Sequence, residues 1–201
     1  GWSVMLNGYH AESAGRALSS QLPGSGYLDA DVGDPDQADM LVHAAVAQLG
    51  RLDLVVNNAG IARQIPHRDV DAVSDSFWDE VMRVNLKGPW NVTKAAWPHL
   101  RQWRGQVINT GSLAGLSVAG SSIPYAVSKA GVLHLTRLLA KALGPEVRVN
   151  AIAPGYIDTP LTHDWQQLRD TVERDAPAQR LGSVDDVADA QRVAEVMRVV
   201  E

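Results

Sequence analysis

The sequence predicts an α/β fold in which a doubly wound parallel sheet is covered by helices on both faces. Short apolar runs alternate along the chain with longer stretches that keep helical spacing. This alternation is typical of parallel strands joined by crossover helices. Polar and glycine-rich residues follow several of the apolar runs. In a parallel sheet these positions gather at the carboxyl edge, where ligands bind.

The first half of the chain is expected to hold three strands and three helices. The strands are expected at 3–7, 27–30 and 52–56, and the helices at 11–22, 35–49 and 76–100. Asp34-Pro35 has the form of an N-cap followed by proline at the first helical position, and Gly50 ends the same helix. Gly88-Pro89 is expected to bend the third helix.

The second half continues the same alternation. A strand over 107–111 leads to Ser112, and a helix with Tyr125 near its start follows. A strand over 147–153, a helix-prone polar stretch over 156–180 and a helix from Asp185 complete the chain. No repeat or linker divides these elements, so residues 1–201 are expected to form one domain with one sizeable core.

Composition excludes several classes of partner. The net charge of -5 comes without a basic block, so nucleic acid is not expected. Cysteine is absent and the six histidines lack metal-ligand spacing, so no metal site is expected. No apolar run approaches the ~18 residues of a membrane span and no signal peptide is visible. We therefore expect a cytoplasmic protein without a membrane partner.

Tyr125 and Lys129 form the candidate catalytic pair, thirteen residues after Ser112. Positions i and i+4 share one face of a helix, so the phenol and the ammonium project into the same space. A nearby ammonium lowers the pKa of a tyrosine from ~10, which suits a general acid/base acting on an alcohol oxygen. Ser112, at a strand end, can add a hydrogen bond to that oxygen. The alternative is an ordinary tyrosine beside a solvated lysine, and the polar strand ends favour the catalytic interpretation.

Five motifs follow one another along the chain: Asn57-Asn58-Ala59-Gly60, Asn85, Ser112, Tyr125-x-x-x-Lys129 and Pro154-Gly155. In this order, with 27 residues from Asn85 to Ser112 and 13 from Ser112 to Tyr125, they resemble the short-chain dehydrogenase/reductase family. The resemblance extends from Gly1 to about Ala190, and several spaced motifs are more specific than one. It implies a Rossmann-like fold and an oxidoreductase that interconverts a carbonyl and a secondary alcohol by hydride transfer.

The resemblance also implies a role for each catalytic residue. Tyr125 matches the residue that gives or takes the hydroxyl proton, and Lys129 matches the lysine that lowers the pKa of this tyrosine and binds the nicotinamide ribose. Ser112 matches the residue that orients the substrate carbonyl. Asn85 matches the residue that holds a proton-relay water, and a role in satisfying the bend near Gly88-Pro89 is equally compatible.

The implied cofactor site follows the strand ends. Asp31 and Val32 match the adenine-binding position, although a turn at the strand end explains Asp31 equally well. The other matching positions are Asn58, Ala59, Gly60, Ile157 and Thr159, together with Tyr125 and Lys129. Asp158 is expected to be a loop residue only.

Cofactor preference depends on the end of the first strand. NAD-dependent members carry an acidic residue there for the ribose 2′-hydroxyl, and Gly8 takes its place here, followed by Tyr9 and His10. Because a 2′-phosphate would not be repelled, NADP(H) is expected in preference to NAD(H). No arginine lies in this loop to bind the phosphate.

Two family features have no counterpart in the chain. The family begins with a strand and a glycine-rich turn, whereas this chain begins at what matches the second strand and contains no G-x-G-x-x-G. The family's last strand is not matched either. Such a sheet would expose strand edges, so we expect these segments to exist outside the 201 residues. The alternative is a true fragment or a decayed paralogue.

Substrate and assembly are the least constrained by the sequence. A run from Ala176-Pro177 to Leu181-Gly182 follows a lid-like stretch and is most similar to 3-oxoacyl-thioester reductases, although sugar and steroid members share it. A non-catalytic nucleotide-sensing or scaffold protein with the same fold is the second hypothesis. The helices at 76–100 and from Tyr125 are apolar over much of their circumference, which predicts a homodimer or homotetramer. The alternative is that segments outside the 201 residues cover these faces within one chain.

Overall fold

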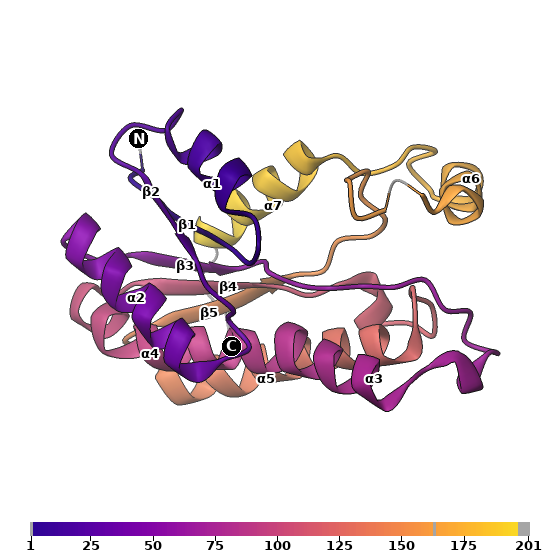
Figure 1. The fold of residues 1–201 in the computed structure, drawn as a ribbon, viewed down its shortest axis with the longest axis horizontal. Helices are drawn as coiled ribbons and strands as arrows, with labels where there is room; N and C mark the ends of the chain where they lie inside the picture. The colour runs from indigo at the N-terminus through magenta and orange to yellow at the C-terminus, as the bar shows by residue number, and fades with distance from the viewer. Residues whose placement is uncertain (1, 163, 197–201) are drawn as a thin grey trace.

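Parallel strands form the centre of the molecule. The computed structural model describes residues 2–162 and 164–196. Two ladders contain the strands β1 (Met5–Gly8), β2 (Gly26–Asp29), β3 (Leu54–Asn57), β4 (Gln106–Thr110) and β5 (Arg148–Ile152). β1 pairs with β2, and β3, β4 and β5 pair in that order, all in parallel (Figure 1). This arrangement confirms the predicted doubly wound α/β class.

The two ladders are separate within the described residues. β1 pairs with β2 alone and β3 with β4 alone, so each has an unpaired edge. Apolar contacts join the ladders instead, because Ala30 and Val32, which follow β2, belong to the same buried cluster as Val55 and Val107. The additional strand that the sequence leads us to expect outside the 201 residues stays a prediction.

Helices form one layer on each face of the strands. They are α1 (Glu12–Ser19), α2 (Pro35–Leu49), α4 (Gly88–Trp103), α5 (Ile123–Leu143) and α7 (Val184–Val196). Figure 1 shows α2, α4 and α5 below the strands and α1 and α7 above them. The main buried cluster contains Leu41, Leu100 and Leu139, which bring α2, α4 and α5 against the strands. No helix within the described residues is both long and apolar enough to cross a bilayer.

Local sequence sets the ends of α2 and α5. The carboxylate of Asp34 accepts hydrogen bonds from the backbone N–H groups of Asp36 and Gln37, and Gly50 ends α2 with a φ of 78°. The hydroxyl of Ser122 accepts a hydrogen bond from the backbone N–H of Tyr125 and begins α5. Tyr125 therefore stands in the first turn of α5.

The long helix predicted over 76–100 is interrupted by a π-helical segment. α3 (Asp75–Val81) leads into this segment, Met82–Lys87, and α4 continues from Gly88. The irregularity expected at Gly88-Pro89 therefore begins before the proline, as a widened turn that contains Asn85. π-Helical turns of this kind occur frequently at functional sites.

Buried side chains connect β3, β4 and α5 beneath the carboxyl edge of the strands. Asn57 donates hydrogen bonds to Thr93 (3.2 Å) and to Asn109 (2.8 Å), and Asn109 donates to Thr136 (2.9 Å). Asn109 has no exposed surface. Because a buried amide is costly without partners, this series of contacts favours one relative position of the two strands and the helix.

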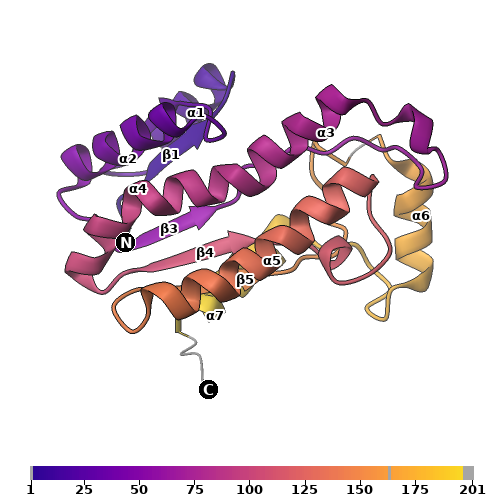
Figure 2. The same cartoon turned by 90° about the horizontal axis from the view of Figure 1, so that it is seen from below.

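Beyond β5 the chain leaves the sheet. Of the residues that the structure describes between 156 and 180, a stretch predicted to be helix-prone, the ten of α6 (Gln166–Asp175) are helical. Figure 2 shows α6 apart from the sheet, beyond the end of α5. Ile157 forms a parallel bridge with Gly182, so the segments before and after α6 are joined at its base.

We predict that Asn109→Ala destabilises the protein by about 2 kcal/mol or more, because it removes two hydrogen bonds and opens a cavity. Denaturant unfolding followed by circular dichroism measures the change. Asn58→Ala, at an exposed position just beyond β3, is the control and is expected to cost less than about 1 kcal/mol. Equal costs for the two variants would contradict the structural importance of the buried contacts.

Candidate active site

The predicted site residues lie at the carboxyl ends of the strands. Asp31 follows β2, Asn58 follows β3, Ser112 follows β4 and Pro154 follows β5. Tyr125 comes from the first turn of α5, the helix that follows the Ser112 loop. The structure therefore places residues up to 123 positions apart, from Asp31 to Pro154, along one edge. This edge is the ligand-binding edge of a doubly wound sheet.

Ser112 and Tyr125 both lie at this edge. The hydroxyl of Ser112 accepts a hydrogen bond from the backbone N–H of Ala114, which begins a short 3₁₀ turn over Leu113–Gly115. Burial raises the pKa of Tyr125, and its hydrogen bond with Ser112 lowers that pKa to a smaller extent. The net effect is a raised pKa, so the phenol is protonated at neutral pH and can act as an acid.

Lys129 differs from its predicted role in one respect. Its ammonium is buried, donates a hydrogen bond to the carbonyl of Thr110 at 2.7 Å, and lies 5.7 Å from the centre of the Tyr125 ring. Burial lowers its own pKa to about 8. The expectation that Lys129 lowers the pKa of Tyr125 is not met in this structure, because burial has the larger effect on the phenol and the ammonium bonds to Thr110.

Asn85 joins the loop after β3 to α5. Its side chain accepts a hydrogen bond from the N–H of Ile61 (2.8 Å) and donates to the carbonyl of Ile61 (2.9 Å) and to Ser128 (3.2 Å). Asn85 is 1% exposed. The sequence left two roles open for Asn85, a proton-relay role and a structural one, and these contacts support the structural role. Asn85 holds the loop at Ile61, however, and not the expected bend near Gly88-Pro89. The proton-relay role stays a prediction.

The segment after β3 fits a cofactor. Asn58, Ala59 and Gly60 are exposed. A Cβ atom added to Gly60 would lie 3.3 Å from the amide oxygen of Asn85 and 3.7 Å from the ammonium of Lys129. Because glycine has no side chain, the backbone at this position leaves the space beside the buried amine open. The residues present therefore suit a cofactor that passes over this segment and reaches Lys129.

Asp31 has a partner that the sequence analysis missed. Its carboxylate accepts hydrogen bonds from the N–H of Gly33 (2.8 Å) and from the guanidinium of Arg83 (2.6 Å). The first contact confirms the turn at the strand end, and adenine binding stays a prediction. The carbonyl of the adjacent Val32 accepts a hydrogen bond from Asn91 (3.0 Å). No local pattern could identify Arg83, because it lies 52 residues away on the π-helical segment.

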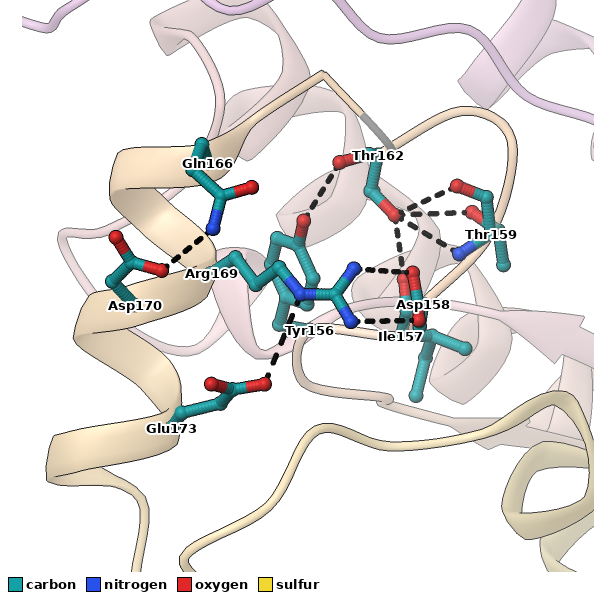
Figure 3. A network of polar contacts seen from close by, with 9 residues as sticks. All are labelled: Tyr156, Ile157, Asp158, Thr159, Thr162, Gln166, Arg169, Asp170 and Glu173. Carbon is teal, nitrogen blue, oxygen red and sulfur yellow. Dashed lines mark hydrogen bonds and ion pairs between the residues drawn. The ribbon is translucent and has the colours of Figure 1, made fainter.

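Ile157 and Thr159 lie in a loop held by polar contacts at the base of α6 (Figure 3). The hydroxyl of Thr162 donates to the carbonyl of Ile157 at 2.7 Å and accepts from the N–H of Thr159 at 3.1 Å. Asp158, expected to be a loop residue only, accepts two hydrogen bonds from Arg169 on α6, at 2.9 and 3.0 Å. The ion pair connects the candidate nicotinamide loop to α6. Because Asp158 lies outside α6, no pattern within the helix identifies the pair.

Comparisons with known proteins agree with this geometry. A family model described as enoyl-(acyl carrier protein) reductase matches residues 1–193. A protein of Streptomyces violaceoruber, assigned as ketoacyl reductase 2 of the granaticin polyketide synthase, is 44% identical over 94% of this chain and 78% of its own length. The 3-oxoacyl-(acyl-carrier-protein) reductase of Thermotoga maritima is 39% identical over 79% of this chain, and the match spans 64% of that relative.

Solved structures show the same relationship. A protein from Burkholderia xenovorans, assigned as a short-chain dehydrogenase/reductase, superimposes with a TM-score of 0.89 at 33% identity, over 100% of this chain and 83% of its own. The gluconate 5-dehydrogenase of Burkholderia cenocepacia, solved with NADP and tartrate, superimposes with a TM-score of 0.85 at 30% identity, over 94% of this chain and 76% of its own length. The chain therefore belongs to the short-chain dehydrogenase/reductase family and is an NAD(P)-dependent oxidoreductase.

Proposed function

We propose that the protein reduces the 3-oxo group of an acyl thioester to a secondary alcohol, with Tyr125 as the proton donor. The observation that carries this proposal is the position of Tyr125. Its phenol is near enough to Ser112 for that hydroxyl to lower its pKa, and its ring lies beside the buried amine of Lys129, at the ligand-binding edge of the sheet. A bound nicotinamide cofactor would supply the hydride, and this chain's residues would bind the carbonyl and deliver the proton.

Each catalytic side chain has a separate task in this proposal. Tyr125 protonates the carbonyl oxygen as it gains charge, which its raised pKa favours because the phenol keeps its proton at neutral pH. Ser112 donates a second hydrogen bond to the same oxygen. Lys129 holds the cofactor ribose and replaces the proton on Tyr125, for which a pKa of about 8 is well placed. Asn85 keeps the Ile61 loop beside α5 and would hold the relay water.

The relatives support the substrate class. Two of them are named for the reduction of ketoacyl or 3-oxoacyl groups, and the run from Ala176 to Gly182 points in the same direction. The loop after β5, with Ile157 and Thr159, would contact the nicotinamide amide, and α6 would cover the substrate.

The cofactor site is proposed to run along the edge from Asp31 and Val32, through Asn58, Ala59 and Gly60, to Lys129. The chain is NAD(P)-dependent by family, and Gly8 favours NADP(H) by the sequence rule. The related gluconate 5-dehydrogenase was solved with NADP. The groups around Gly8 decide between the two cofactors.

We predict that the protein reduces a 3-oxobutanoyl thioester and that Tyr125→Phe lowers kcat by about 10²-fold to 10⁴-fold, because the proton donor is lost while the ring still packs. The decrease in nicotinamide absorbance at 340 nm measures turnover, and thermal unfolding measures folding. Tyr156→Phe is the matched control. It removes a hydroxyl that donates to the carbonyl of Thr162 at the base of α6, and it should keep most activity. Turnover at the wild-type rate in Tyr125→Phe would refute the assignment of the proton donor.

The buried amine of Lys129 leads to a prediction about pH and stability. Its pKa is lowered from 10.5 to about 8 by burial in the folded state. Below pH 8 the ammonium is charged in both the folded and the unfolded state. The folded state is then destabilised by the full free energy of burying that charge. Between about pH 8 and the unperturbed value of 10.5, the folded state loses this proton while the unfolded state keeps it. Over this range the free energy of unfolding of the wild type, relative to that of Lys129→Met, therefore rises by about 3 kcal/mol.

Denaturant unfolding at several pH values from 7 to 10 measures this difference. Lys141→Met, at an exposed position in the last turn of the same helix, is the control and should show no such trend. A constant difference between the wild type and Lys129→Met across this range would show that the ammonium is not buried.

We also propose a homodimer or homotetramer built on α4 and α5. Val92, Ala96 and Leu139 are in the core, whereas Trp90, Val127 and Leu138 are 45%, 42% and 54% exposed. A hollow of about 660 Å³ lies on the same side, lined by Asp79, Met82, Arg83, Leu86, Lys87, Trp90 and Leu135. Large apolar side chains around a hollow favour burial against a second subunit.

We predict that Trp90→Asp dissociates the oligomer into monomers, because it places a charge in the proposed interface. Sedimentation velocity at micromolar concentration measures the state of the protein. Leu18→Asp, which changes a residue on α1 with 50% exposure, is the control and should leave the assembly intact. A wild-type protein that sediments as a monomer would contradict the interface.

A further inference from the structure

The inference concerns the loop between β1 and α1 and rests on the proposed function, because it names the nicotinamide cofactor that this function uses. β1 ends at Gly8, and α1 begins at Glu12. In the sequence analysis Gly8 alone carried the expectation of NADP(H). The structure shows which other side chains reach this loop.

Asp29, the last residue of β2, reaches the loop from the neighbouring strand. It is the ladder partner of Gly8. Its carboxylate accepts hydrogen bonds from the backbone N–H groups of His10 (3.1 Å) and Ala11 (3.0 Å), and from the hydroxyl of Tyr27 (3.0 Å). The two amides immediately before α1 are therefore already bound to an anion.

The loop conformation agrees with this role. His10 has a φ of 55°, in the left-handed region that non-glycine residues seldom adopt. This turn directs two successive N–H groups at one carboxylate. The Ala11 amide is the largest of the causes that lower the pKa of Asp29, so the side chain is ionised at neutral pH.

Gly8 itself has little room for a side chain. A Cβ atom at this position would lie 3.0 Å from the Tyr27 hydroxyl and 3.1 Å from the Cβ of Ala11. A side chain at position 8 would therefore meet the side chains around Asp29. For this reason the residue at position 8 alone is a poor guide to cofactor preference. The carboxylate that β1 lacks is supplied by β2.

Among the described residues, the charges near this loop give a phosphate little compensation. Backbone N–H groups at the start of a helix normally form an anion site, but here Asp29 occupies them. The guanidinium of Arg16 on α1 forms two hydrogen bonds with Glu12, at 2.9 and 2.8 Å. A 2′-phosphate carries close to two negative charges and would have to displace the carboxylate or bind beside it.

We infer that Asp29 determines cofactor preference by occupying the anion position of the Gly8–Ala11 loop, so that the protein binds NAD(H) more tightly than NADP(H). This reverses the expectation from Gly8. A ribose 2′-hydroxyl is neutral and is compatible with a neighbouring carboxylate, which can accept its hydrogen bond.

The test compares nucleotide binding without turnover. Isothermal titration calorimetry gives the dissociation constants of NADH, NADPH, 5′-AMP and adenosine 2′,5′-bisphosphate. The wild type should bind NADH more tightly than NADPH, and 5′-AMP more tightly than the bisphosphate. Asp29→Asn should shift both preference ratios toward the phosphorylated member by at least about tenfold, because it removes the charge that repels the phosphate.

Three further variants identify the cause of any shift. Asp29→Ser also removes the charge and should shift the ratios in the same direction, so the test does not depend on one variant folding well. Tyr27→Phe removes a partner of the carboxylate and keeps its charge, and Asp36→Asn removes an exposed charge in the first turn of α2. Both controls should keep the wild-type ratios within about twofold. Thermal unfolding verifies that each variant is folded.

The outcomes separate this inference from the proposed function. A wild type that prefers NADPH and the bisphosphate overturns the inference even if it reduces the thioester. Ratios that stay unchanged in Asp29→Asn and Asp29→Ser, or that move equally in Asp36→Asn, also overturn it. If the wild type binds NADH more tightly and the ratios shift as expected, but no thioester is reduced, the proposed function fails and the inference about Asp29 stands.

Discussion

The hydrogen bonds of Asn85 are the contacts on which the rest of the candidate site depends. They join the loop after β3, the π-helical segment and α5, which no strand ladder connects. Through Ser128, whose hydroxyl donates to the carbonyl of Tyr125, they also reach the first turn of α5. Each of these groups is buried or half-buried, so a displacement would leave a polar atom without a partner. The position of Tyr125 relative to the loop after β3 is therefore maintained by one buried amide.

The order of the elements and the edge that holds the site could be predicted from the sequence, because both depend on local patterns. Asp34 and Gly50 mark the ends of α2 in a way that needs no tertiary information. The spacing of Tyr125 and Lys129 likewise predicts a shared helix face, and α5 carries both residues. These predictions succeed because each depends on residues that lie within a few positions of one another.

Contacts between distant segments, and the effects of burial, could not be predicted. Arg83 pairs with Asp31, and Asn109 with Thr136, across separations of 52 and 27 residues that carry no periodic signal. The predicted effect of Lys129 on the pKa of Tyr125 was wrong in this structure, because the sequence shows the spacing of the two side chains and not their burial. The prediction of NADP(H) preference used only Gly8, at the end of β1. The carboxylate of Asp29 reaches the same loop from β2.

The residues discussed for the site come from both ladders of the described residues. Gly8 and Asp29 stand on the ladder of β1 and β2 and Asp31 follows it, whereas Ser112 and Tyr125 stand on or beside the ladder of β3, β4 and β5. The contacts between the two parts include the apolar cluster around α2, the Asp31–Arg83 ion pair and the hydrogen bond from Asn91 to Val32. A ligand that follows this edge would touch groups from both ladders. Its affinity would therefore depend on the contacts that position the ladders relative to each other, as well as on the groups that touch it.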